Sequence, residues 1–203
     1  MNIVIIKYNA GNIMSVEFAL KRLGIQPILT NDPDEIRKAD KVIFPGVGEA
    51  STTMKHLREK NLDQLIAGLK QPVLGICLGM QLMCSHSEEG NTPCIGIFPE
   101  TVTRFVHPEK NGSHDEPKLK IPQIGWNSIH QLKGKLFDHS LEGQYVYFVH
   151  SYYVPLSSYT TAKTSYHVQY SAAVEKDNFF ATQFHPEKSS SVGEQILKNF
   201  IHL

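Results

Sequence analysis

Apolar and polar residues alternate along the first half of the chain in the way that successive strands and helices do. Four short apolar runs predict strands: Asn2–Tyr8, Ile25–Leu29, Lys41–Phe44 and Val73–Ile76. Between them apolar residues recur at the helical period, which predicts four helices: one from a cap at Asn12 to Gly24, then 34–39, 51–70 with a break near Asn61, and 78–85. This alternation implies right-handed crossovers and a parallel sheet.

The second half has a different pattern, with short strands separated by turn residues. Six segments are strand candidates: Thr101–Val106, Ser128–Leu132, Tyr145–Val149, Thr160–Ser165, Ser171–Glu175 and Phe179–Phe184. The turn at 176–178 suggests a hairpin, and the hydrophilic stretch 107–118 predicts an exposed loop. A helix from Val192 to Ile201 closes the chain. With no repeat or linker, residues 1–203 are predicted to form a single α/β domain.

Composition and charge narrow the class of protein. The 203-residue chain has 20 basic and 20 acidic residues, so it lacks the basic field that is typical of nucleic-acid binding. The first apolar run stops at Lys7, too early for a signal peptide, and no apolar stretch is long enough to span a membrane. Three cysteines are too few for a disulfide framework. We therefore expect a cytoplasmic protein that binds neither membranes nor nucleic acid.

The strongest chemical signal is Gly75-Ile76-Cys77-Leu78-Gly79, where a predicted strand turns directly into a helix. This is the nucleophile-elbow pattern with cysteine in place of serine, in which glycines permit a sharp turn that exposes the sulfur. The N-terminus of the following helix favours the thiolate, and the Leu78 N–H faces the position of a developing oxyanion. The alternative, a buried structural cysteine, is what we expect for Cys84 and Cys94.

A thiolate nucleophile needs a base and a group that orients the base. His185-Pro186-Glu187 follows the last predicted strand, and residues two apart in an extended segment project to the same face. Pro186 is expected to keep the segment extended. The Glu187 carboxylate can then fix the His185 tautomer and stabilise its imidazolium form. His150, which has no carboxylate near it in the sequence, is the alternative base.

Two stretches resemble the class I, or triad, glutamine amidotransferases: Gly-Ile-Cys-Leu-Gly-Met-Gln at 75–81 and Gln-Phe-His-Pro-Glu-Lys-Ser at 183–189. Four more narrow the resemblance to the glutaminase subunits of imidazole glycerol phosphate synthases: Tyr-Asn-Ala-Gly-Asn at 8–12, Pro-Gly-Val-Gly at 45–48, Ile-Gly-Trp-Asn at 124–127 and Tyr-Phe-Val-His-Ser-Tyr at 147–152. The resemblance implies a flavodoxin-like, doubly wound, mostly parallel sheet with helices on both faces and extra antiparallel strands in the C-terminal half.

The resemblance also implies roles for individual residues. Cys77, His185 and Glu187 match the family's catalytic triad, and the backbone N–H groups of Val47 and Leu78 match its oxyanion donors. The residues that match its substrate-binding positions are Gly46, Gly48, Gln81, Glu89, Ser151 and Tyr152. For Glu89, the alternative is a solvated acid. Tyr147 and Lys188 fall where the family meets its synthase partner, or else are ordinary surface residues.

By this resemblance the chain is expected to hydrolyse L-glutamine through a γ-glutamyl thioester on Cys77. It would supply the ammonia to a (β/α)₈-barrel cyclase partner in a heterodimer of histidine biosynthesis, with no metal or organic cofactor. Three alternatives stay open: an ammonia-supplying paralogue for another synthase, such as a sugar-amidating one, a free-standing cysteine γ-glutamyl hydrolase, and a non-catalytic binding subunit. Departures from the family pattern bear on loop shape or partner contacts: Asn9, Glu49-Ala50 and a long loop at 107–118.

Overall fold

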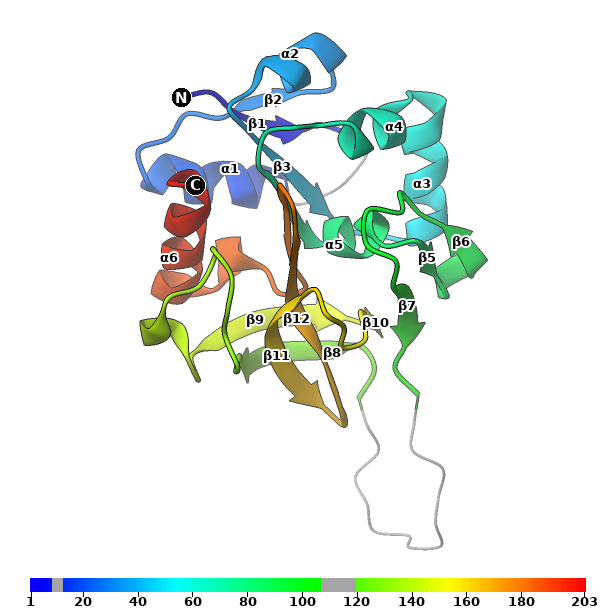
Figure 1. Ribbon diagram of the computed structural model, residues 1–203, viewed down its shortest axis with the longest axis vertical. Coiled ribbons are helices and arrows are strands. Elements are labelled where there is room, and N and C mark those ends of the chain that lie inside the picture. Colours follow the sequence, from blue (N-terminus) through cyan, green and yellow to red (C-terminus); the bar gives the residue numbers. More distant parts are fainter. Residues whose placement is uncertain (9–12, 107–119) are drawn as a thin grey trace, which may run out of the picture.

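A seven-stranded, mostly parallel sheet forms the centre of the computed structural model, which describes residues 1–8, 13–106 and 120–203 (Figure 1). Five strands are parallel: β1 (Ile3–Ile6), β2 (Ile28–Thr30), β3 (Lys41–Gly46), β4 (Val73–Cys77) and β13 (Phe179–Thr182). Two antiparallel strands extend one side: β12 (Val168–Lys176) and β11 (Thr160–Tyr166). The spatial order β11-β12-β13-β4-β3-β1-β2 contains the flavodoxin-like strand order, so the predicted fold class is confirmed.

Helices cover both faces of this sheet. On one face α1 (Ile13–Arg22) and α6 (Ser190–Ile201) lie side by side, joined by an ion pair between Arg22 and Glu194 and by one hydrophobic cluster with Ile3 and Ile5. Helices on the other face share a second cluster with Val4 and Ile6. These are α2 (Pro33–Lys38), α3 (Ala50–Glu59), α4 (Leu62–Ala67) and α5 (Leu78–Met83). Among the helices described here, none combines the length and the apolar character that crossing a bilayer requires.

Two smaller sheets complete the second half. One has the order β10 (Tyr152–Tyr153), β7 (Thr101–Arg104), β5 (His86–Ser87), β6 (Thr92–Pro93), and the other pairs β8 (Gln123–Ser128) with β9 (Tyr145–His150). Two short 3₁₀ helices lie between their strands, η1 (Glu89–Asn91) and η2 (His139–Leu141), and a third, η3 (Pro186–Lys188), lies between β13 and α6. The Tyr147 carbonyl in β9 accepts the backbone N–H of His185 at 2.9 Å, so β9 passes the carboxyl end of β13.

The largest difference from the sequence-based elements lies in the middle of the chain. The strand predicted at Ser128–Leu132 is wrong, because the strand ends at Ser128. In β8 the polar Gln123 is buried whereas Ile124 and Trp126 are exposed, which reverses the burial that apolar periodicity indicates. The break predicted near Asn61 is confirmed, since Asn61 adopts a left-handed conformation between α3 and α4. The cap expected at Asn12, the departure at Asn9 and the loop expected at 107–118 lie outside the described residues.

Three glycines let β3, β4 and α5 approach one another closely. A Cβ atom on Gly79 of α5 would lie 2.0 Å from the Phe44 carbonyl oxygen in β3, and one on Gly46 would lie 2.6 Å from the Gly79 nitrogen. A Cβ on Gly75 of β4 would lie 2.9 Å from the Met83 sulfur. The glycine spacing around Cys77 therefore follows from backbone packing, which holds α5 directly against the strands from which it emerges.

The close approach of Gly79 predicts a large loss of stability on substitution. Gly79→Ala should lower the free energy of unfolding by about 3 kcal/mol or more, because backbone has to shift to relieve the contact. Gly68→Ala is the matched control: its Cβ would lie 3.4 Å or more from its neighbours, and its φ is −89°. Urea denaturation measures both, and equal midpoints for Gly79→Ala and the parent protein would contradict this account.

Candidate active site

The nucleophile elbow predicted at Cys77 is present in the structure. Cys77 ends β4 immediately before α5, with φ 54° and ψ −109°, a conformation that L residues rarely adopt. Such strain persists only where the surrounding structure holds it, and here Cys77 is paired in register with Gly46 of β3. The turn carries the sulfur to the carboxyl edge of the sheet, where ligands bind in open α/β folds.

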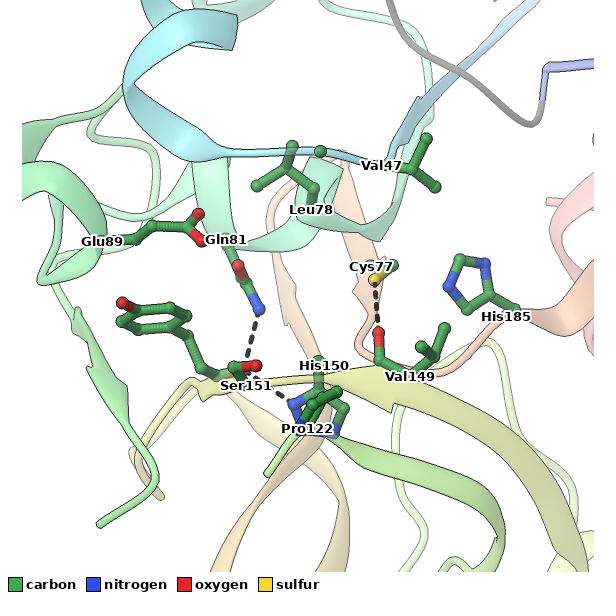
Figure 2. Close-up of a pocket in the computed structure, with 12 residues that line it drawn as sticks. Val47, Cys77, Leu78, Gln81, Glu89, Pro122, Val149, His150, Ser151 and His185 are labelled. Atoms are coloured by element: carbon green, nitrogen blue, oxygen red, sulfur yellow. Dashed lines mark hydrogen bonds between the residues drawn. The ribbon is translucent and has the colours of Figure 1, made fainter. Parts of the chain in front are cut away.

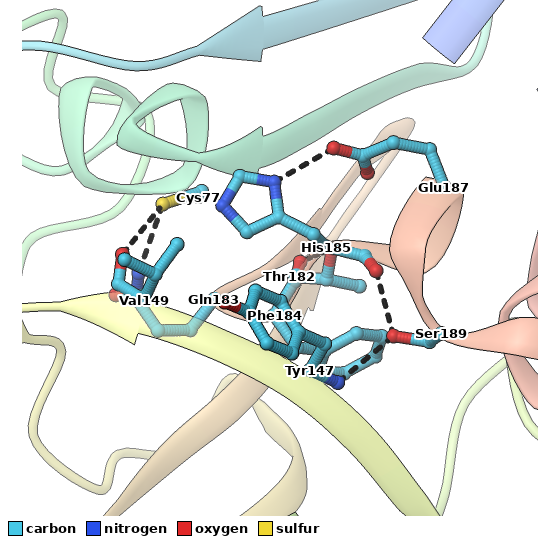
Figure 3. A network of polar contacts seen from close by, with 9 residues as sticks. All are labelled: Cys77, Tyr147, Val149, Thr182, Gln183, Phe184, His185, Glu187 and Ser189. Atoms are coloured by element: carbon cyan, nitrogen blue, oxygen red, sulfur yellow. Dashed lines mark hydrogen bonds and ion pairs between the residues drawn. The ribbon is translucent and has the colours of Figure 1, made fainter. Parts of the chain in front are cut away.

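His185 and Glu187 form a hydrogen-bonded pair beside Cys77 (Figure 3). Nδ1 of His185 lies 2.7 Å from Glu187 Oε1, and both side chains are almost completely buried. The other ring nitrogen, Nε2, faces Cys77. Burial by itself would lower the pKa of His185, but the hydrogen bonding and charge of Cys77 and then of Glu187 outweigh it and raise this pKa above its usual value. An imidazolium ion is therefore favoured within reach of the sulfur.

The extended geometry predicted for His185-Pro186-Glu187 is wrong. His185 itself is extended, with φ −97° and ψ 96°, but Pro186–Lys188 form the 3₁₀ helix η3. Proline suits the first position of a helical turn because it has no N–H to satisfy and its φ is already near the helical value. The helical turn, rather than strand alternation, therefore brings the Glu187 carboxylate to Nδ1 of His185.

Contacts from β9 and α6 fix the backbone around His185. Ser189 donates its hydroxyl to the His185 carbonyl at 2.6 Å and accepts the Tyr147 backbone N–H at 3.0 Å. A Cβ on Gly193 of α6 would lie 1.9 Å from the Pro186 carbonyl oxygen, so glycine is needed where α6 meets η3. The sequence did not single out Ser189 or Gly193, because their roles depend on contacts that only the folded chain shows.

Cys77 and His185 open onto a cavity of about 300 Å³ (Figure 2). Nine of the predicted site residues line it: Val47, Gly48, Cys77, Leu78, Gln81, Glu89, Ser151, Tyr152 and His185. Its other lining residues are Pro122, Val149 and His150. Gly46 and Glu187 are not among the lining residues, and Tyr147 and the exposed Lys188 also lie outside the lining. The structure thus gathers the predicted catalytic and substrate-binding residues around one cavity, with Gly46 and Glu187 outside its lining.

The end of the cavity away from His185 is polar (Figure 2). Gln81 donates Nε2 to the Tyr152 carbonyl at 2.9 Å and to Gln183 Oε1 at 3.0 Å. Glu89 accepts the backbone N–H of Ala50 at 2.8 Å, and burial raises the pKa of its carboxyl despite this hydrogen bond. Glu89 is half-buried, so the alternative of a fully solvated acid does not describe it. A carboxylate here can receive a positively charged group.

The predicted oxyanion donors, Val47 and Leu78, lie on the same wall of the cavity (Figure 2). Tyr8 holds the segment that leads to Val47. Its buried hydroxyl donates to the Pro45 carbonyl, and its ring packs on Phe44. After Val47, Gly48 has φ +111°, which favours glycine. One end of this segment is therefore fixed and the other has conformational freedom.

His150, the alternative base, is engaged elsewhere. Its Nδ1 lies 2.7 Å from the Tyr152 carbonyl and its Nε2 lies 3.1 Å from the Tyr170 hydroxyl. A carbonyl oxygen only accepts hydrogen bonds, so the proton of the neutral ring is on Nδ1. Burial lowers the pKa of His150 to about 4, which keeps it neutral at neutral pH. His150 therefore supports the cavity wall, and His185 is the histidine in position to act on Cys77.

Comparison with known proteins identifies the family. The model of the glutamine amidotransferase class-I family matches residues 4–203. The chain belongs to this family. It is 58% identical over 203 residues to the imidazole glycerol phosphate synthase subunit HisH of Bacteroides fragilis strain YCH46. It is 56% identical over 203 residues to the same subunit of Bacteroides thetaiotaomicron. Both alignments cover the full length of both chains. The recognition of a glutaminase subunit of this synthase family, and hence of an enzyme, is confirmed.

Solved structures show that this class-I amidotransferase shares its fold with distant relatives. A putative GMP synthase protein from Thermoplasma acidophilum has a TM-score of 0.70 at 20% identity, with 100% of this chain and 93% of the other covered. Another structure, described as a glutamine amidotransferase, has a TM-score of 0.70 at 19% identity over 98% of this chain and 97% of the other. The fold thus persists at sequence identities too low to carry information on substrate or partner.

The burial of neutral His150 predicts a loss of stability in acid. Because its pKa falls from 6.5 to about 4 on folding, the unfolded chain binds the proton more readily between these pH values. The free energy of unfolding should decrease as the pH falls through this range, with roughly 3 kcal/mol attributable to His150. His150→Gln cannot titrate and should lose less, whereas the exposed control His139→Gln should follow the parent protein. Urea denaturation at several pH values provides the test, and parallel curves for His150→Gln and parent would contradict it.

Proposed function

We propose that Cys77, His185 and Glu187 form a catalytic triad that hydrolyses L-glutamine to glutamate and ammonia. The observation that carries the proposal is the alignment of a cysteine on a strained turn, a buried histidine and a buried carboxylate 2.7 Å from that histidine. These groups can serve as nucleophile, base and orienting acid. We assign residues 1–203 to one amidotransferase domain, because both hydrophobic clusters share the seven-stranded sheet.

The reaction has two steps. The Cys77 thiolate attacks the side-chain amide carbon of glutamine, and the imidazolium of His185 protonates the departing ammonia, leaving a γ-glutamyl thioester. Neutral His185 then activates a water that hydrolyses the thioester to glutamate. In both steps negative charge develops on the carbonyl oxygen, and the backbone N–H groups of Val47 and Leu78 are our candidates to stabilise it.

The amino-acid end of glutamine belongs at the polar end of the cavity. Its α-ammonium group is attracted by the half-buried Glu89 carboxylate, and Gln81, Ser151 and Tyr152 offer hydrogen bonds. Gly48, which lines the cavity, and Gly46 behind it give the substrate close access to the backbone. Glutamine held in this way has its amide carbon near Cys77. The chemistry proposed here uses side chains and backbone groups and requires no metal or organic cofactor.

We propose that the ammonia passes to a (β/α)₈-barrel cyclase in a cytoplasmic heterodimer, which makes imidazole glycerol phosphate and AICAR for histidine and purine metabolism. The relatives named as imidazole glycerol phosphate synthase subunits support a partner of this kind. Exposed apolar side chains on the β8–β9 hairpin supply a surface for it: Ile124, Trp126 and Tyr145 are each more than half exposed. Tyr147, which contacts Trp126 edge to face, and Lys188 would extend this contact.

Covalent labelling tests the nucleophile. An electrophilic glutamine analogue should modify Cys77 stoichiometrically, because this sulfur lines the cavity beside His185. Burial raises the pKa of Cys84 and raises that of Cys94 to about 11, so the other two thiols should stay unmodified. Peptide mapping by mass spectrometry reads out the label. Label on Cys84 or Cys94 with Cys77 untouched would refute the assignment.

A second experiment separates ammonia production from ammonia use. With the cyclase partner bound, Cys77→Ala should lose glutamine-dependent synthesis by at least about a thousandfold and keep synthesis from ammonium salts, because Cys77 acts only on glutamine. Size-exclusion chromatography confirms that the variant still assembles, and Cys94→Ala is the matched control. An assembled Cys77→Ala complex that also loses ammonia-dependent synthesis would show that this subunit takes part in the cyclase reaction. Failure of the parent protein to support that cyclase would favour a paralogous pathway.

A further inference from the structure

Gln183 is a fully buried amide that lies between two parts of the proposed site. It follows β13 and precedes the His185 segment, and its backbone N–H donates to the Ala172 carbonyl at 2.8 Å. Its side chain has no exposed surface and reaches Cys77 on one side (Figure 3). On the other side it reaches Gln81. A buried polar group costs stability unless its hydrogen bonds are satisfied, so this amide is held in a specific orientation.

The hydrogen bonds determine which end of the Gln183 amide faces the sulfur. The Tyr152 carbonyl can only accept, so the atom of Gln81 that lies 2.9 Å from it is the nitrogen Nε2. The same nitrogen lies 3.0 Å from Gln183, which must present its oxygen Oε1 there. The nitrogen Nε2 of Gln183 then points at Cys77 Sγ, 3.7 Å away. Turning either amide would place two donors or two acceptors against each other.

We propose that Gln183 is a positioning residue that stabilises the thiolate of Cys77 through its Nε2–H and couples that thiolate to substrate bound at Gln81. The proposal rests on the glutaminase reaction proposed above and deepens it. An N–H donor favours a charged sulfur over a neutral thiol, because hydrogen bonds to charged groups are the stronger ones. Both reaction steps use this property, since the thiolate is the nucleophile in the first and the leaving group in the second.

The other polar neighbour of the sulfur acts in the opposite direction. The Val149 carbonyl oxygen lies 3.8 Å from Sγ and can only accept, so it favours the protonated thiol and disfavours the thiolate. When His185 holds the proton, Gln183 Nε2 is thus a second side-chain donor, beside the His185 imidazolium, that offsets this carbonyl. Without the Gln183 amide, the sulfur would keep the Val149 carbonyl of β9 as an acceptor and would lose its amide donor on the side of β13.

The amide chain also connects the two ends of the substrate. Gln81 Oε1 makes no hydrogen bond to any other residue that the structure describes, so it is available to the α-ammonium group of glutamine at the polar end of the cavity. A cation at Oε1 polarises the Gln81 amide and strengthens its donation to Gln183, which in turn strengthens donation to the sulfur. The chain from Gln81 to Gln183 to Cys77 would therefore favour the thiolate most when the substrate's amino group is bound.

The test compares Gln183→Met, which keeps the length of the side chain and removes the N–H, with the parent protein. Gln123→Met is the matched control, because Gln123 is also buried but hydrogen-bonds to the Tyr170 hydroxyl rather than to Cys77. The rate of Cys77 carboxamidomethylation by iodoacetamide is measured from about pH 6 to about pH 10, with peptide mapping to identify the labelled thiol. Glutaminase kcat and KM are measured on the same proteins with the partner bound.

Gln183→Met should be carboxamidomethylated at Cys77 about ten times more slowly than the parent near neutral pH. The two rates should converge at the alkaline end, where the thiolate fraction of Cys77 no longer depends on this hydrogen bond. Its glutaminase kcat should fall about tenfold or more with little change in KM, because the lost hydrogen bond is made to the reacting sulfur. Gln123→Met should follow the parent protein in both assays. A purely structural role would instead change the thermal midpoint of Gln183→Met and leave its pH profile unaltered.

Equal alkylation profiles for Gln183→Met and the parent protein would overturn the proposal. If Gln183→Met does not fold, NMR of the parent protein decides, because the assigned side-chain N–H signals of Gln183 should shift when Cys77 is carboxamidomethylated. Unchanged signals would equally overturn it. A parent protein that has no glutaminase activity and no label on Cys77 would instead refute the proposed function. The two failures are therefore distinguishable.

Discussion

The site depends on one backbone constraint, the direct passage of β4 into α5 at Cys77. A non-glycine residue with φ 54° and ψ −109° is strained by about 1–3 kcal/mol. The strain is sustained because β4 is paired on both sides, with β3 as far as Gly46–Cys77 and with β13 as far as Thr182–Ile76. Gly79 completes the arrangement by letting α5 rest on the Phe44 carbonyl. Relaxing the turn would require separating paired backbone or moving a helix.

The same pairing explains how distant segments form one site. Parallel strands end at a common edge, so the residues after β3, β4 and β13 converge there although they are far apart in the sequence. Val47 follows β3, Cys77 ends β4, and His185 follows β13. The antiparallel β9 then closes the edge and supplies both a carbonyl for the His185 backbone and the Val149 carbonyl near the sulfur. The sheet thus places the residues of the candidate site at one edge, and β9 covers that edge.

The sequence predicted those features that local chemistry determines. Apolar runs identified the parallel strands because all of them except the edge strand β2 are buried on both faces. Glycine spacing identified the elbow because steric contact with β3 requires it. The prediction from sequence failed for β8. There the buried Gln123 accepts a hydrogen bond from the Tyr170 hydroxyl, which lies on a strand about fifty residues away in the sequence. It also missed Ser189 and Gln183, whose partners Tyr147 and Cys77 are distant along the chain. Long-range polar contacts leave no periodic signal in a single sequence.

The two buried histidines of the cavity show how neighbours, rather than burial alone, decide which ring carries a charge beside Cys77. Both His150 and His185 line the cavity and both are removed from water, which by itself lowers the pKa of either ring. At His150 the hydrogen bond to the Tyr152 carbonyl favours the charged ring, but burial outweighs it and the nearby His185 disfavours a second charge. His185 has the Glu187 carboxylate on one nitrogen and the Cys77 sulfur opposite the other, so its charged form is stabilised. Desolvation therefore keeps one ring neutral as part of the cavity wall, while the partners of the other ring favour its charged form beside Cys77.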